Sequence, residues 1–128
     1  VSNTGVVATD TTGVGTARHY PGAARYGADK ALFGYGGASS GYLSLTNKVS
    51  NVGVVATDTT GVGTERRYPG AAGYGADLAI FGYGVNFPSL YSLTNKVSNT
   101  GVVSTDTTGV GTARWGLSAT GYSTDKAI

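Results

Sequence analysis

The residue types that could carry out chemistry are scarce in this sequence of 128 residues. His19 is the one histidine and cysteine is absent, whereas a zinc site needs about three or four nitrogen, sulfur or carboxylate ligands. Aspartate recurs in Asp-Thr-Thr-Gly at Asp10, Asp58 and Asp106. A calcium loop draws several oxygen ligands from closely spaced acids, and each of these segments offers one. We therefore expect no metal site, and we expect each aspartate to cap its own turn.

No pattern of side chains predicts catalysis either. The sequence has no Ser/His/Asp arrangement and no paired carboxylates. The glycine-rich segment 13–18 superficially suggests a phosphate-binding loop, but no Lys-Ser/Thr pair follows it and no helix is expected after it. We therefore expect a protein that is not an enzyme and that uses no cofactor.

Charge and composition exclude two further classes of function. The chain has 9 Lys and Arg against 7 Asp and Glu, a formal net charge of +2, and its basic residues recur singly. A nucleic-acid-binding surface needs basic residues gathered on one face, so no nucleic acid is expected as a partner. No run of about 18 apolar residues is present, so we expect no membrane insertion. The 22 glycines, with no helical periodicity, indicate an all-β chain with many turns.

The elements that position these residues are set by an internal repeat. The motif Val-Ser-Asn begins at Val1 and returns at Val49 and Val97, a period of 48 residues, and the copies align without gaps. The units are 1–48, 49–96 and the incomplete 97–128, and we expect them to form one repeat domain over 1–128. A fixed period in this range is typical of proteins whose units bury their apolar faces against neighbouring units.

Each unit is expected to hold four short antiparallel strands. Counted from Arg18, one set of four strands covers 20–26, 30–36, 43–50 and 54–57, with a variable loop at 37–42, and the third unit repeats the first strand around 116–119. Residues 43–50 alternate between apolar and polar, as in a half-buried strand. Four short strands per unit predict a blade of a β-propeller. A β-solenoid with about two rungs per unit is the alternative.

The order of motifs within the unit resembles the kelch repeat. Arg18 precedes a short strand of small residues, and 31–36 is an apolar strand that ends in glycines. The Ser/Thr/Gly/Tyr-rich sequence looks most like the kelch-like repeats of virion structural proteins of tailed bacteriophages. This resemblance implies a propeller of four-stranded blades with a structural or adhesive role in a virion tail or fibre, or outside the cell. The positions expected to be structural are Arg18, Arg66, Arg114, Gly34, Gly36, Gly82, Gly84, Asp10, Asp58 and Asp106.

The number of repeats predicts an assembly. The chain supplies about two and two-thirds blades, whereas propellers have about four to eight. A partial ring would leave strand edges open. We therefore expect the ring to be closed by other chains, as a homo-oligomer or with other virion proteins, or by sequence outside this chain.

The differences between units predict a ligand-binding face. Because strands alternate in direction, the segments around 37–42 and 17–20 and their counterparts should emerge on one face, and there the copies diverge toward aromatic residues and arginine. Loops on a rigid scaffold often bind ligands, and such side chains are frequent contact anchors. A cell-surface glycan is the expected ligand. The candidate residues are His19, Tyr20, Tyr42, Arg67, Tyr68, Phe87, Tyr91 and Trp115. Two alternatives are a lectin and a designed or recently amplified self-assembling repeat propeller with no ligand.

Overall fold

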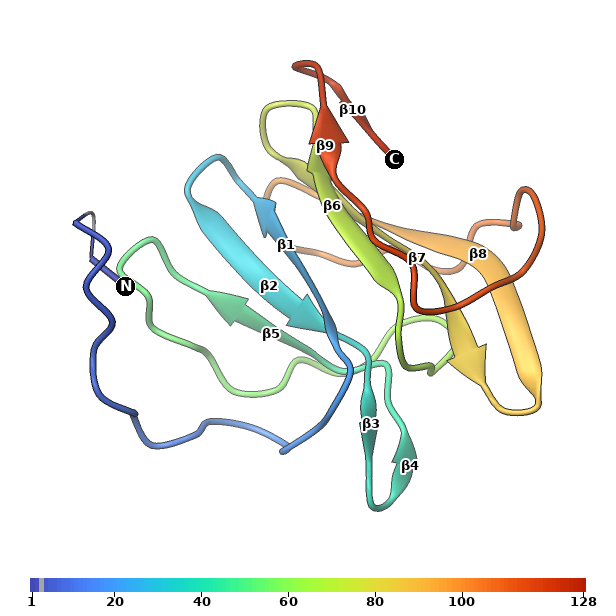
Figure 1. Ribbon diagram of the computed structural model, residues 1–128, viewed down its shortest axis with the longest axis horizontal. Helices are drawn as coiled ribbons and strands as arrows, with labels where there is room; N and C mark the ends of the chain where they lie inside the picture. The colour runs from blue at the N-terminus through green and yellow to red at the C-terminus, as the bar shows by residue number, and fades with distance from the viewer. Residues whose placement is uncertain (3) are drawn as a thin grey trace.

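The computed structural model describes residues 1–2 and 4–128, and within them the chain forms antiparallel β-strands and no helix (Figure 1). The strands are β1 (Gly22–Tyr26), β2 (Lys30–Gly34), β3 (Gly37–Ala38), β4 (Gly41–Tyr42), β5 (Thr46–Val49), β6 (Gly70–Tyr74), β7 (Leu78–Asn86), β8 (Ser89–Val97), β9 (Gly121–Tyr122) and β10 (Lys126–Ala127). The prediction of an all-β chain is confirmed.

The first two units fold on one plan. Each contributes a three-stranded sheet, β1-β2-β5 in the first unit and β6-β7-β8 in the second. The registers match as well, since Ala31 pairs with Val49 in the first sheet and Ala79 pairs with Val97 in the second. The third unit contributes the short hairpin β9–β10, and β3–β4 is a second small hairpin. The sequence repeat is therefore a structural repeat.

Three expected elements differ from those observed. The fourth strand, 54–57, is absent, and the chain there makes isolated bridges such as Val49 to Val55. Its ladder is interrupted because the Asn47 side-chain amide donates to the Ala56 carbonyl at 3.1 Å. The loop at 37–42 is the β3–β4 hairpin, and its counterpart is the continuous end of β7 and start of β8. The expected strand at 116–119 is irregular, and β9–β10 is the one ladder of strands in the described part of the third unit, which otherwise makes isolated bridges such as Val97 to Val103.

Small residues let neighbouring sheets approach closely, as expected. Strand β1 packs against β6, which in turn packs against β9 (Figure 1). A methyl group on Gly22 would lie 3.1 Å from Ala71 Cβ, and one on Gly34 would lie 2.6 Å from Phe81 Cζ. The core runs between the first two sheets and includes the buried side chains of Leu32 and Tyr35. The sheets thus stack in series, and residues 1–2 and 4–128 form neither a closed ring of blades nor a solenoid.

Candidate functional site: an aromatic strip on one edge of the sheets

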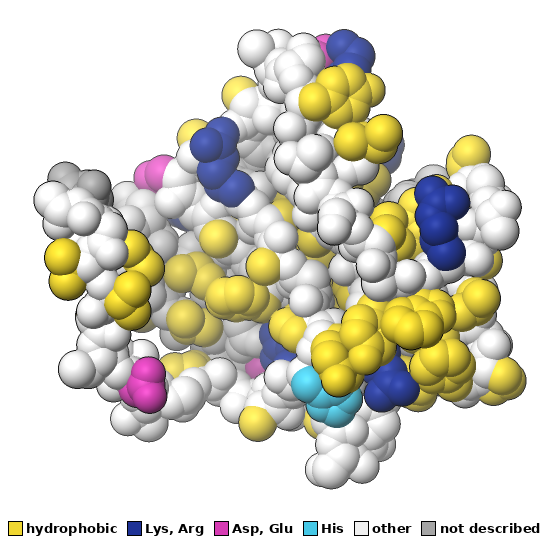
Figure 2. Space-filling view, in the orientation of Figure 1, with side chains coloured by type: hydrophobic (Ala, Val, Ile, Leu, Met, Phe, Trp, Pro, Cys, Tyr) yellow, Lys and Arg dark blue, Asp and Glu magenta, His cyan; other side chains and the backbone are white. Residues whose placement is uncertain are grey.

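The structure brings seven of the eight candidate ligand-binding residues together. We call this cluster the aromatic strip. Its members are His19, Tyr20, Tyr42, Arg67, Tyr68, Phe87 and Trp115. Figure 2 shows the corresponding band of hydrophobic side chains at the lower right, with the histidine and basic side chains beside it. The expectation that the divergent segments emerge on one face is confirmed.

The rings of the strip form a continuous series. Tyr20 and Tyr68 are stacked, with ring centroids 4.0 Å apart and planes inclined at 22°. His19 meets Tyr20 edge-on at 4.8 Å. On the other side, Trp115 lies 5.0 Å from Tyr68 and 6.0 Å from Phe87. Tyr20, Phe87 and Trp115 each expose about half of their surface. The strip therefore presents aromatic surface to solvent while its rings support one another.

Arg67 provides the positive charge within the strip. Its guanidinium carbon lies 5.1 Å from the Tyr42 ring centroid, 5.4 Å from that of Phe87 and 5.7 Å from that of Tyr68. The Phe87 amide donates to the Tyr42 hydroxyl at 3.1 Å, which fixes two of these rings. In the described part of the chain, no carboxylate lies within ion-pair distance of Arg67. The cation is held by ring faces, so its charge remains available to a ligand.

A backbone feature of the repeat sets the spacing of the strip. Tyr20, Tyr68 and Gly116 occupy the same position of successive units, and all three have positive φ, at 57°, 56° and 69°. The Tyr68 amide donates to the Tyr20 carbonyl at 3.0 Å, and the Gly116 amide donates to the Tyr68 carbonyl at 3.4 Å. Non-glycine residues rarely adopt this conformation. These hydrogen bonds hold corresponding residues of successive units side by side, so the strip continues from one unit to the next.

Tyr91 is the candidate that the structure places outside the strip. It lies in β8 opposite Gly84, and its backbone carbonyl accepts from the Arg114 amide at 3.4 Å. Within the described residues its ring forms no aromatic pair with the rings of the strip. The register of β7 and β8 explains this, because Tyr91 pairs within the ladder and not at the turn that carries Phe87.

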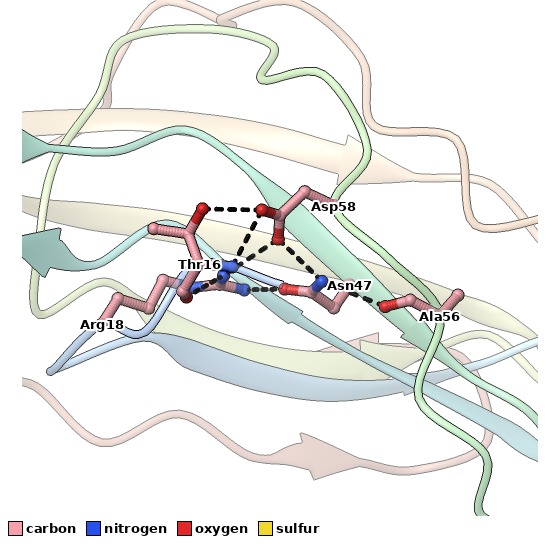
Figure 3. Close-up of polar contacts among 5 residues, drawn as sticks. All are labelled: Thr16, Arg18, Asn47, Ala56 and Asp58. Atoms are coloured by element: carbon pink, nitrogen blue, oxygen red, sulfur yellow. Dashed lines mark hydrogen bonds and ion pairs between the residues drawn. The ribbon is translucent and has the colours of Figure 1, made fainter. Parts of the chain in front are cut away.

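A second set of recurring residues braces each unit, and sequence reasoning had recognised only part of it. We call it the bracing network: Thr16, Arg18, Asn47 and Asp58 (Figure 3). Asp58 accepts from the Thr16 hydroxyl at 2.7 Å and from the Asn47 amide at 2.8 Å. Arg18 donates to Asn47 and lies 3.6 Å from Asp58. The start of the unit is thereby tied to its end.

The bracing network corrects one expectation. Asp58 was expected to cap its own turn, yet its Thr16 partner lies 42 residues earlier in the chain. Asp106 makes the same link to Thr64, again over 42 residues. The turn interpretation was therefore wrong for both aspartates. The sequence could not show this, because an Asp that caps its own turn and an Asp that bonds to a distant segment occur in the same Asp-Thr-Thr-Gly motif.

The second copy of the network is buried. Arg66 is fully buried and donates to the Tyr83 carbonyl at 2.6 Å, the Asn95 side chain at 2.7 Å and the Thr64 carbonyl at 2.8 Å. Its guanidinium also lies 4.0 Å from the ring centroid of Tyr35 in the preceding unit. Burial lowers the pKa of Arg66. The expected bracing role of this arginine is confirmed, and it links two units as well as closing one.

No family model and no curated protein matches this chain. Within the described residues there is no group of three or more His, Cys, Asp or Glu side chains placed to hold a metal ion. The described residues also contain no helix that is long and apolar enough to cross a membrane.

We expect the bracing network to make the folded protein less stable at acid pH. The hydrogen bond from the Thr16 hydroxyl lowers the pKa of Asp58. A carboxyl group with a lowered pKa in the folded state stabilises the fold above its unfolded-state pKa of about 3.9, and this contribution is lost as pH falls below it. The melting temperature should therefore fall between about pH 5 and pH 2, and it should fall less for Asp58→Asn. Asp10→Asn is the matched control, because no hydrogen bond joins Asp10 to the described residues. Equal acid sensitivity in wild type and Asp58→Asn would contradict this role.

Proposed function

We propose that this chain is a non-enzymatic structural and adhesion component, a kelch-like β-propeller part of a bacteriophage virion or appendage, and that the aromatic strip binds glycans on a cell surface. The single observation that supports this most is the aromatic strip. Seven residues at or beside the positions that diverge between units meet in one series of partly exposed side chains. The protein would act outside the cell or on the virion, with further copies or other virion proteins as partners.

A glycan suits the chemistry of the strip. The faces of sugar rings carry C–H groups that pack on aromatic rings, while tyrosine hydroxyls and an arginine bind the polar edges. Tyr20, Phe87 and Trp115 offer exposed ring surface, and Arg67 adds hydrogen-bond donors beside them. The β-sheets beneath hold these groups at fixed spacing, which reduces the ordering cost of binding.

The propeller interpretation is supported by the way the units are built. Each of the first two units is an antiparallel sheet whose first strand packs against the first strand of its neighbour. The bracing network then joins the start of a unit to the segment after its third strand. A braced antiparallel sheet that stacks on its neighbour is consistent with the short repeated sheets from which propellers are built.

We expect Tyr68→Gly to weaken glycan binding by about tenfold or more, since tenfold corresponds to 1.4 kcal/mol and truncated anchor residues often cost this much. Glycine is the appropriate substitution because Gly116 occupies the same backbone conformation in the third unit. Binding is measured as retention on cell-surface polysaccharide and on a glycan array. Trp115→Ala should have a similar effect.

The matched control is Tyr122→Ala, which removes a half-exposed tyrosine on β9, outside the strip. It should leave retention unchanged. If Tyr68→Gly and Trp115→Ala retain glycans as wild type does, the adhesion role is wrong. If wild type binds no polysaccharide on the array and adsorbs to no cell surface, the ligand class is wrong as well.

A further inference from the structure

Arg67 is a cation of the aromatic strip that no anion of the protein neutralises. Among the described residues the ion pairs involve Arg18, Lys30 and Lys126, and none involves Arg67. The Nε of Arg67 is buried and has no hydrogen-bond partner there. The preceding residue, Arg66, instead donates to three acceptors of the protein. The two adjacent arginines therefore differ in role, since one braces the fold and the other keeps an unpaired charge.

The surroundings of Arg67 exclude part of the water that would otherwise solvate its charge. The residue is half-buried, and the ring centroids of Tyr42, Phe87 and Tyr68 lie between 5.1 and 5.7 Å from its guanidinium carbon. Ring faces attract a cation, but more weakly than an anion does. Because a charge that has lost water and has no partner is unfavourable, an anion gains more beside Arg67 than beside a fully exposed arginine.

The imidazole of His19 meets the Arg67 side chain over Gly37. A methyl group on Gly37 would lie 3.0 Å from His19 Nε2 and 3.7 Å from Arg67 Cδ. The His19 amide donates to the Gly37 carbonyl at 2.8 Å, and the Gly37 amide donates to the His19 carbonyl at 2.9 Å, which fixes the two backbones. Glycine at position 37 lets the imidazole approach closely. The ring nitrogens of His19 therefore add hydrogen-bonding capacity beside the guanidinium.

Carboxylates are scarce where the strip lies. Glu65 is the one acidic residue in the segments that carry the strip, which are 17–20, 37–42, 65–68, 85–91 and 113–116. Glu65 is exposed and lies beyond ion-pair distance of Arg67. Asp29 lies in the turn that follows β1, whereas Tyr20 of the strip precedes β1, so the two are at opposite ends of the strand. The charge of the strip is therefore complementary to an anionic ligand.

We propose that the aromatic strip selects acidic glycans, with a sugar carboxylate bound by Arg67 and the sugar ring stacked on the exposed aromatic rings. This inference rests on the proposed glycan-binding function and specifies its ligand. Phe87 lies between the two contacts, since its ring centroid is 6.0 Å from that of Trp115 and 5.4 Å from the guanidinium carbon of Arg67. A planar guanidinium can donate two parallel hydrogen bonds to a carboxylate. Uronic acids and sialic acids carry that group on a sugar ring.

Matched pairs of ligands test the proposal by isothermal titration calorimetry. One pair is oligogalacturonate and the same oligosaccharide with its carboxyl groups reduced to alcohols, and the other is sialyllactose and lactose. Wild type should bind the acidic member of at least one pair about tenfold more tightly than the neutral member, because hydrogen bonds to charged groups are the stronger ones. The pair that shows the preference identifies the kind of acidic sugar. Added salt should weaken binding of the acidic member and affect the neutral member little.

Variants of Arg67 separate its charge from its packing. Arg67→Gln should weaken binding of the acidic ligand by about tenfold more than binding of the neutral one, because a change in ring packing affects both ligands alike. Arg67→Lys keeps the charge but loses the planar fork, so it should restore only part of the preference. Arg25→Gln is the matched control. It removes the same charge from an exposed site on β1, outside the strip, and should leave the preference unchanged.

The contrary results are distinct from failure of the glycan-binding proposal. Circular dichroism and thermal melting show whether each variant is folded. Equal affinity of wild type for the acidic and neutral members of both pairs overturns the selection of acidic glycans and leaves glycan binding standing. So does an equal loss for both ligands in Arg67→Gln, or an Arg25→Gln variant that loses the preference as Arg67→Gln does. Wild type that binds neither acidic ligand also overturns it, while retention on the glycan array still tests the adhesion role.

Discussion

Arg66→Ala is expected to lower the free energy of unfolding by several kcal/mol. The substitution removes a fully buried guanidinium that donates to Tyr83, Asn95 and Thr64. Three acceptors then lose their donor, and the ring of Tyr35 loses the cation stacked on it. A buried acceptor left without its donor costs about 1–3 kcal/mol, so the loss of three donors removes a large share of the stability of a small domain, about 5–15 kcal/mol. Urea denaturation followed by circular dichroism measures the loss.

Arg114→Ala is the matched control, because Arg114 occupies the same position one unit later. Arg114 is exposed, lies 4.6 Å from the Tyr83 ring centroid, and donates to the Thr112 carbonyl at 3.5 Å. We expect it to shift the urea midpoint little. If Arg66→Ala and Arg114→Ala unfold at the same urea concentration, Arg66 does not brace the junction between units.

The sequence located the aromatic strip because its signal is a difference between aligned copies. Residues such as Arg67 and Trp115 stand out against His19 at the same position of the unit. Alternation of strand direction then placed these segments on one edge without knowledge of the packing. The same argument failed for Tyr91, because its position depends on how far β7 and β8 extend before they turn, and turn length sets register.

The bracing network was partly missed because its members lie far apart in the chain. Thr16 and Asn47 recur one period later as Thr64 and Asn95, so the repeat did contain a signal. The repeat does not show which residue bonds to which, and so reasoning from neighbouring residues assigned Asp58 to its own turn. The absent fourth strand has the same origin. The Asn47 side chain donates to the Ala56 carbonyl, which a regular β-ladder would have bonded to a backbone amide. Strand propensity does not predict such competition from a side chain.

Phe81→Ala is expected to destabilise the protein about as strongly as Arg66→Ala. Phe81 is fully buried between the first two sheets, against Gly34 and the Tyr35 ring. Truncation of a buried phenylalanine costs about 3–5 kcal/mol, because apolar surface is lost and a cavity remains. Thermal and urea denaturation, with the loss read from the midpoint at constant slope, measure the effect.

Phe33→Ala removes the same side chain from the same strand position of the first unit, where it is 40% exposed. In dilute solution its effect should be about 1 kcal/mol or less. The contrast between the two phenylalanines isolates the junction between sheets, since strand pairing and composition are matched. If both substitutions lower the free energy of unfolding equally, the first two sheets do not stabilise each other through the contact of Phe81 with Gly34 and Tyr35. If Phe81→Ala alone is severe, a phenylalanine seated over glycine is the contact that joins one unit to the next.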